Sequence, residues 1–162
     1  GGSSSYLICH KHSKFKVKKS KINKILHEEK KYGIEEEATY KSFKKRIDNL
    51  KMKINSKIEN IIKKKKVIHG YAASTKGNVL LQYFKLDGKK IKFISDRNPK
   101  KNNLYTPGSN IKIITESTSR KMKPDYYLVL AWHFKKEILA RERIIRKKGT
   151  KFIFPLPKVE II

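Results

Sequence analysis

The chain has 162 residues and carries 41 Lys and Arg against 14 Asp and Glu, a formal net charge of +27 at pH 7. This length suits one domain with a buried core and an added helical arm. The single Cys9 excludes an internal disulfide and a cysteine-rich zinc module. No apolar run approaches the roughly 18 to 20 residues of a membrane span. We therefore expect a protein of the reducing cytoplasm with no membrane partner.

The high positive charge is compatible with nucleic-acid binding, because clustered Lys and Arg contact phosphate backbones. However, only six of the 41 basic residues are Arg, and the lysines are spread over every segment. Arg is the side chain that recognises bases and phosphates through two parallel hydrogen bonds. The pattern favours a solvated surface, and a nucleic-acid-binding protein stays an alternative interpretation.

The first 19 residues predict a short strand and a loop. Tyr6 to Cys9 is a short apolar run after a Gly- and Ser-rich opening. His10 and His12 could share one face of an extended segment, but no nearby carboxylate would complete a metal site. We therefore expect no metal.

Residues 20–66 predict a helical connector. Ser20 is placed to cap a first helix, and Gly33 to end it. Apolar residues from Tyr40 to Ile61 recur every three or four positions, which predicts a long amphipathic helix. Its apolar stripe could form a coiled-coil seam in a homodimer or scaffold; we favour the interpretation that it packs along the following domain or links that domain to something N-terminal.

From residue 67 to residue 162, short apolar strands alternate with helices. This alternation is typical of a Rossmann-like α/β fold with a doubly wound, mostly parallel sheet, here of about five strands. The strands are expected at residues 67–70, 90–95, 111–114, 126–131 and 151–154, and the main helices at 76–84 and 135–148.

The chemically unusual residues follow the expected strand ends, where open parallel sheets bind ligands. The first strand runs into GYAASTKGN, whose small residues let the backbone approach a ligand, and Lys76 adds a cation at a helix start. Asp96 follows the second strand, where an acidic residue often bonds ribose hydroxyls. The turn lacks the three-glycine dinucleotide fingerprint, which argues against a dehydrogenase, and a purely structural tight turn would also explain it.

Four segments carry a family resemblance: GYAASTKGNVLLQYF, DRNPKKNNLYTPGSNIKI, KPDYYLVLAWHFKKEI and GTKFIFPLPKVEII. In this order and spacing they resemble the C-terminal, pseudo-Rossmann domain of bacterial S-adenosylmethionine-dependent sugar C-methyltransferases. GGSSSYLICHK resembles the end of the family's central domain, and YGIEEEATYKSF its helical connection. One departure is Ala72, where a second glycine is common.

The resemblance implies that residues 67–162 bind a nucleotide-diphosphate sugar. A zinc module, the S-adenosylmethionine site and a Tyr-x-Glu-His run with the acid and base groups would belong to a domain before Gly1, in cis or on a separate chain. We therefore expect no cofactor on this chain and no methyl transfer by it alone.

The resemblance also assigns roles to individual residues. Ser74, Thr75, Lys76 and Asn78 would surround the phosphates, and Asp96, Arg97 and Asn98 the ribose or base. The remaining candidates are Tyr71 at the first strand end, Tyr105 and Gly108 in a closing loop, and Trp132 and His133 beside the sugar or base.

Each assignment has a structural alternative. Trp132 could fill the core, Asp96 and Arg97 could form an ion pair at a strand end, and Asn78 could cap or pack its helix. His133 is a candidate general base, but no orienting acid is visible in the sequence, so we expect no catalytic residue here.

Overall fold

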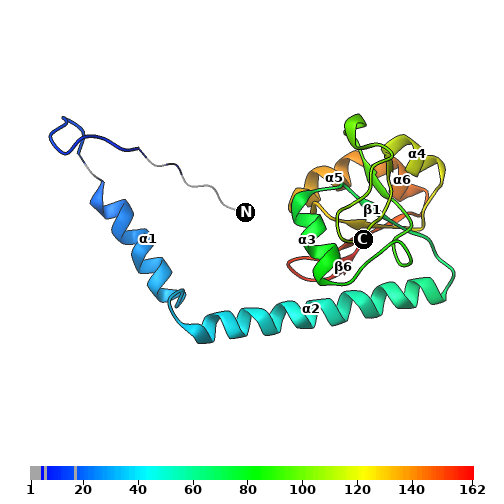
Figure 1. Cartoon of the computed structure of the whole chain (residues 1–162), viewed down its shortest axis with the longest axis horizontal. Coiled ribbons are helices and arrows are strands. Elements are labelled where there is room, and N and C mark those ends of the chain that lie inside the picture. The colour runs from blue at the N-terminus through cyan, green and yellow to red at the C-terminus, as the bar shows by residue number, and fades with distance from the viewer. Residues whose placement is uncertain (1–4, 6, 17) are drawn as a thin grey trace. The chain divides into compact units, whose positions relative to one another are not determined.

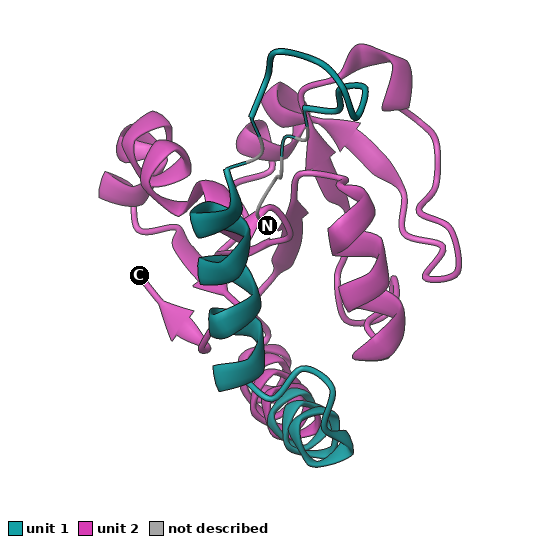
Figure 2. Ribbon diagram, turned by 90° about the vertical axis from the view of Figure 1, so that its left-hand side faces the viewer, with its two compact units in different colours: residues 1–47 teal, residues 48–162 magenta. Residues whose placement is uncertain are grey.

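A computed structural model describes residue 5, residues 7–16 and residues 18–162. The chain forms two compact units, residues 1–47 and residues 48–162 (Figure 2). The division falls inside helix α2 (Glu37–Lys63), so the second half of this helix belongs with the sheet.

The first unit contains α1 (Lys19–Lys31) and the start of α2. Lys18 occupies the N-cap of α1 and makes no side-chain capping bond. Ser20 is the second residue of the helix, so the predicted Ser20 cap is wrong. Gly33 follows the C-cap residue of α1 with φ +62°, which confirms the predicted glycine stop.

The strand predicted at residues 6–9 is not formed by Leu7, Ile8 and Cys9, which are exposed and have no regular structure. Tyr6 lies outside the described residues. A single short strand has no stability without a neighbour to accept its backbone hydrogen bonds, and none is present in the described residues of this unit.

The second half of α2 packs within the second unit. Ile54, Ile58 and Ile61 are buried there, whereas Tyr40 and Phe43 near the start of the helix are more than half exposed. Asn55 Nδ2 donates to the Phe84 carbonyl over 2.9 Å. The predicted packing of the apolar stripe is therefore confirmed for the second half of the helix.

The second unit is built on a six-stranded sheet with the order β3-β2-β1-β4-β5-β6. All neighbouring pairs are parallel except β5 and β6, which confirms the Rossmann-like class. The short β6 is additional to the five expected strands. The strands are β1 (Ile68–Tyr71), β2 (Ile94–Asp96), β3 (Ile113–Thr115), β4 (Tyr126–Val129), β5 (Lys151–Phe154) and β6 (Glu160–Ile161).

Helices cover both faces of this sheet (Figure 1). One face carries α3 (Thr75–Tyr83), and the other carries α4 (Glu116–Lys121), α5 (Lys135–Arg141) and α6 (Arg143–Lys147). Short 3-10 helices, η1 (Pro99–Lys101) and η2 (Trp132–Phe134), follow β2 and β4. Because side chains alternate along a strand, Gly70 faces α3, and His69 and Tyr71 face α4 and α5.

In the second unit, two predicted elements differ from the structure by more than two residues at one end or by an interruption. The helix expected at residues 135–148 is interrupted at Glu142, whose φ of −94° and ψ of 21° are not helical and whose carboxylate enters a buried ion-pair network. The second strand starts at Ile94 rather than Lys90, because the Lys90 and Ile91 amides both close a turn on the Asp87 carbonyl. Within the described part of the chain, no helix is long and apolar enough to cross a membrane.

Candidate functional site

The strand order reverses at β1, from which the chain continues to β2 on one side while β4 lies on the other. In such sheets the crevice beyond the carboxyl ends of the two central strands is the usual ligand site. The Leu130 amide donates to the Tyr71 carbonyl over 3.0 Å, and Ser74 Oγ donates to the Leu130 carbonyl over 3.2 Å. The β1–α3 turn is therefore fixed against the end of β4.

Two glycines allow close packing around this turn, Gly70 against β2 and Gly77 against the end of β4. A Cβ atom at Gly70 would lie 2.8 Å from Ile94 Cγ1, and one at Gly77 would lie 2.6 Å from Leu130 Cβ. Real Cβ atoms do not tolerate such distances. Gly77 therefore lets α3 pack directly on β4, which is the task of the last glycine in dinucleotide-binding turns.

The N-terminus of α3 opens on the crevice. Ser74 is its N-cap and accepts a 3.0 Å hydrogen bond from the Gly77 amide, so α3 begins one residue before the predicted Lys76. The Thr75 and Lys76 side chains are exposed, and their amides lie in the first turn, where N–H groups have no intrahelical acceptor. These amides, the positive end of the helix dipole and the Lys76 ammonium together suit an anion.

Asn78 lies one turn further along α3. Its amide is used within the helix, since it donates to the Ser74 carbonyl over 3.0 Å. Its side-chain Oδ1 is buried and has no hydrogen-bond partner in the described part of the chain. The predicted capping alternative is therefore not what this side chain does, because Ser74 provides the cap.

Asp96 and Lys101 hold both polar groups of the Ala73 peptide. Asp96 Oδ2 accepts from the Ala73 amide over 2.7 Å, and Lys101 Nζ donates to the Ala73 carbonyl over 2.8 Å. Lys101 Nζ also lies 3.5 Å from Asp96 Oδ2. The ion partner of Asp96 is thus Lys101 and not the predicted Arg97. No sequence signal separated Lys101 from the many surface lysines.

Ala72 is left-handed, with φ +70°. A glycine would adopt this conformation at little cost, whereas the Cβ of an alanine makes the left-handed conformation costly. The hydrogen bonds of Asp96 and Lys101 to the Ala73 peptide therefore hold a turn whose backbone conformation is unfavourable for Ala72.

Of the other predicted residues, some lie at the carboxyl ends of the strands and others lie away from them. Arg97 and Asn98 are exposed after β2, and Asn98 Oδ1 accepts from the Lys100 amide over 3.0 Å, capping η1. The loop that carries Tyr105 and Gly108 meets the far end of α3, because Gln82 Nε2 donates to the Pro107 carbonyl. The structure therefore does not bring Tyr105 and Gly108 to the N-terminus of α3.

Trp132 and His133 follow β4 directly, in η2. Trp132 is half-buried and packs on the core cluster that includes Tyr71 and Ala131, and its ring is perpendicular to that of His133 at 5.8 Å. His133 is exposed, and none of the described carboxylates forms a hydrogen bond or ion pair with it. Trp132 combines the predicted core role with a position at the crevice.

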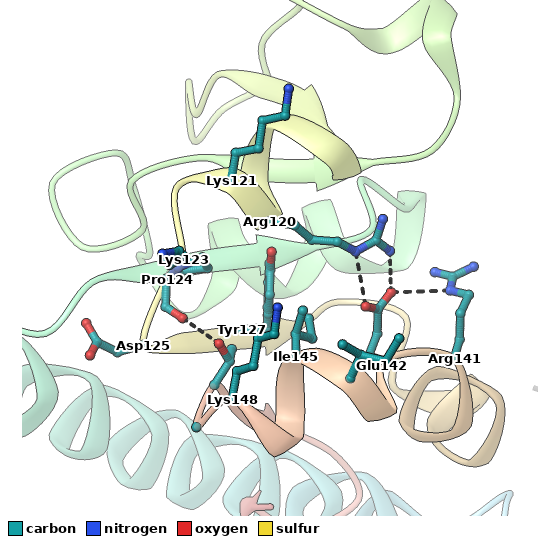
Figure 3. Close-up of a pocket in the computed structure, with 13 residues that line it drawn as sticks. Arg120, Lys121, Lys123, Pro124, Asp125, Tyr127, Arg141, Glu142, Ile145 and Lys148 are labelled. Atoms are coloured by element: carbon teal, nitrogen blue, oxygen red, sulfur yellow. Dashed lines mark hydrogen bonds and ion pairs between the residues drawn. The ribbon is translucent and has the colours of Figure 1, made fainter.

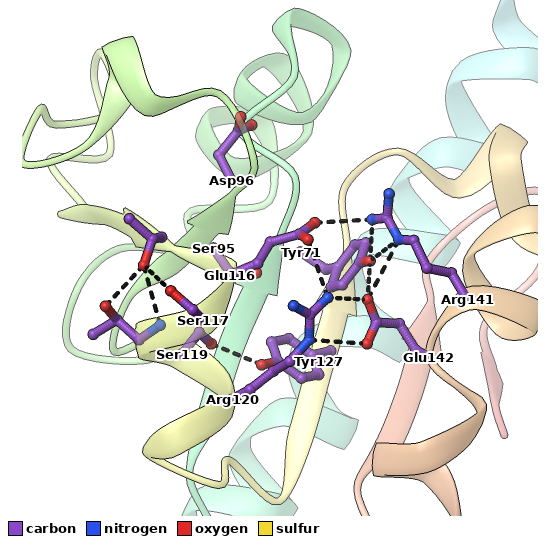
Figure 4. A network of polar contacts seen from close by, with 12 residues as sticks. Tyr71, Ser95, Asp96, Glu116, Ser117, Ser119, Arg120, Tyr127, Arg141 and Glu142 are labelled. Atoms are coloured by element: carbon purple, nitrogen blue, oxygen red, sulfur yellow. Dashed lines mark hydrogen bonds and ion pairs between the residues drawn. The ribbon is translucent and has the colours of Figure 1, made fainter.

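Tyr71 faces the opposite side of the sheet and is 2% exposed (Figure 4). Its hydroxyl donates to Glu142 Oε1 over 2.6 Å and accepts from Arg141. Burial, together with the hydrogen bond to Glu142, raises the pKa of Tyr71. The side chain therefore stabilises the fold and does not line the crevice.

Sequence reasoning missed the polar network around Tyr71. Arg120 binds Glu142 through two hydrogen bonds and also pairs with Glu116, which pairs with Arg141. Burial alone would raise the pKa of Glu142, but hydrogen bonds from Arg120 and Tyr71 outweigh it and lower that pKa. The members lie up to 71 residues apart, so no local pattern predicts their contact.

No group of three or more His, Cys, Asp or Glu that could hold a metal occurs among the described residues. The predicted residues that lie at the carboxyl ends of the strands are Lys76 at the start of α3, Arg97 and Asn98 after β2, and Trp132 and His133 in η2.

Comparison with known proteins gives the relationship of the chain. The model of the C-methyltransferase C-terminal domain matches residues 1–157. The chain is also 35% identical over 141 residues to the C-methyltransferase NovU of Streptomyces niveus. That match covers 87% of this chain and 34% of NovU, so the chain spans about one third of the length of this curated relative. The chain therefore belongs to the C-methyltransferase C-terminal domain family.

Proposed function

We propose that residues 48–162 bind the acceptor of a C-methyltransferase, a nucleotide-diphosphate sugar, in the crevice at the carboxyl ends of β1 and β4. The observation that carries the proposal is the α3 N-terminus, which opens on this crevice with exposed Thr75 and Lys76. A diphosphate carries the negative charge that free amides, a helix dipole and an ammonium stabilise together.

The contribution of this chain to catalysis is orientation. Fixing a sugar nucleotide by its diphosphate aligns the reacting carbon with a methyl donor, and such alignment removes a large part of a bimolecular barrier. The turn that would hold the diphosphate is itself fixed by Ser74, Asp96 and Lys101. Asp96 acts through this turn, because both of its oxygens already accept backbone amides, from Ala73 and Asn98.

The methyl donor and the acid and base groups are assigned to another domain, in cis or on a partner chain. S-adenosylmethionine would bind there, and a base would remove the proton beside the sugar ketone to generate the nucleophile. The isolated chain would then bind acceptor but transfer no methyl group.

The proposal is tested by thermal unfolding with dTDP-glucose. The sugar nucleotide is expected to raise the unfolding midpoint, and S-adenosylmethionine to leave it unchanged. Lys76→Gln should reduce the shift, whereas the matched control Lys89→Gln, in an exposed loop after α3, should preserve it. If neither sugar nucleotides nor nucleoside diphosphates shift the midpoint, the ligand assignment fails and the fold stands.

A further inference from the structure

A cavity lies on the face of the sheet opposite to α3 (Figure 3). It has a volume of about 720 Å³ and is lined by residues 120–127 on one side and residues 141–150 on the other. The helices beside it are short: α4 has six residues and α6 has five. Its volume is in the range of small-molecule sites.

The lining of the cavity carries an excess of positive charge. Five cationic side chains line it, against two carboxylates. Both carboxylates have partners already: Glu142 binds Arg120 and Tyr71, and Asp125 accepts from the Val67 amide and pairs with Lys66. The cations of the lining are Arg120, Lys121, Lys123, Arg141 and Lys148.

Three of these cations are not used by the fold. Arg120 and Arg141 are held by Glu116 and Glu142, but Lys121, Lys123 and Lys148 have no ion pair within the residues that the structure describes. All three are exposed and stand at the rim of one cavity. Compact ammonium groups on flexible stems can converge on a phosphate without the fixed geometry that Arg needs.

Two accessible isoleucines, here called the apolar floor, line part of the cavity. Ile144 is 69% exposed and Ile145 is half-buried, whereas Tyr127 and Pro124 are already buried by the protein itself. A ligand that carries only charge would leave this surface unused. A ligand with a carbon skeleton or ring would cover it and gain hydrophobic contact.

We propose that this cavity binds a small organic phosphate, with the phosphate held by Lys121, Lys123 and Lys148 and the carbon skeleton on Ile144 and Ile145. The site is independent of the crevice. It lies at the amino ends of β4 and β5, where Pro124 and Thr150 are joined by a 3.0 Å hydrogen bond, whereas the crevice lies at the carboxyl ends of β1 and β4.

The experiment is an amide NMR titration of the full chain with phenyl phosphate, which combines one ring with one phosphate. The amides of Gly149 and Thr150, inside the cavity, are expected to shift, and those of Thr75 and Lys76 to stay in place. Phenol and inorganic phosphate are the comparison probes. Equal binding of phenol would overturn the role of the lysines, and equal binding of inorganic phosphate would overturn that of the apolar floor.

Substitutions distinguish binding at this cavity from the general attraction of a phosphate to a protein of charge +27. The variant K121Q/K123Q/K148Q should bind phenyl phosphate about tenfold more weakly or worse, because charge-assisted contacts are lost. The control K85Q/K89Q/K92Q, which removes the same charge from exposed residues after α3, should bind as the wild type does. Equal loss in both variants would overturn the site.

Two further variants complete the design. If the triple variant unfolds, Lys148→Gln alone should still weaken binding measurably, and an unchanged affinity would contradict the proposal. Lys76→Gln should leave phenyl phosphate binding unchanged while weakening dTDP-glucose binding, so failure of either site is recognised separately.

Discussion

Replacing Gly77 by Ala tests whether the crevice depends on direct contact between α3 and β4. The added Cβ would lie 2.6 Å from Leu130 Cβ and 2.9 Å from Ser74 Oγ, and neither neighbour is a flexible chain end. Overpacking of this kind costs about 1–3 kcal/mol. Removing a helical glycine contributes about 1 kcal/mol in the other direction. Displacing Ser74 also weakens the N-cap, worth about 1 kcal/mol.

Since the propensity gain and the weakened cap roughly cancel, we expect Gly77→Ala to lower the free energy of unfolding by about 1–3 kcal/mol. Urea unfolding followed by circular dichroism measures this change. Gly88→Ala is the matched control, because its Cβ would meet only the Asn110 carbonyl at 3.9 Å, and it should be close to neutral. If Gly77→Ala equals or exceeds the wild type in stability, helix propensity outweighs the contact and the close-packing argument is refuted.

Three further stability predictions concern other parts of the sheet. Ala72→Gly should stabilise the chain by about 0.5–1 kcal/mol, because relief of the left-handed backbone exceeds the added entropy of the unfolded chain; a loss of stability in urea would contradict this. Burial lowers the pKa of His69 to about 4, so the unfolded chain takes up a proton below about pH 6.5 that the folded chain does not. The contribution of His69 to the free energy of unfolding is complete above about pH 6.5 and falls by about 3 kcal/mol toward pH 4. His69→Phe should flatten this part of the profile of stability against pH, and an unchanged slope would exclude His69 as its cause. Glu142→Gln should cost about 2–3 kcal/mol, because Arg120 loses its buried counter-charge, and a change near zero would show that the network contributes nothing.

Local patterns predicted the elements of the second unit well. The small-residue turn after β1, the helix start near Lys76 and the polar residues after β2 and β4 all lie where alternation and glycine placement indicated. These signals succeed because each depends on neighbouring residues: a strand ends, the backbone turns, and a serine caps the helix.

Contacts between distant residues could not be predicted in the same way. Lys101 reaches Ala73 across 28 positions, and Tyr71 reaches Glu142 across 71. Nothing in the sequence around Tyr71 shows on which face of the sheet its ring lies. For the same reason Asp96 was predicted as a ribose contact, whereas its carboxylate holds the backbone of the turn.

The helical segment shows how tertiary packing selects part of a pattern. The apolar stripe of α2 continues from Tyr40 to Ile61 in the sequence, but only its second half has a core to join. Periodicity indicates which side of a helix is apolar; it does not indicate where along the helix a partner begins.

The central claim is that a sugar nucleotide's diphosphate lies on the N-terminus of α3. An amide NMR titration of the full chain with dTDP-glucose tests it most directly. We expect the amides of Thr75, Lys76 and Gly77 to shift together and Lys76→Gln to weaken binding of the sugar nucleotide, while the Gly149 amide stays unchanged. Binding that shifts Gly149 and Thr150 but leaves the amides of α3 in place would contradict it.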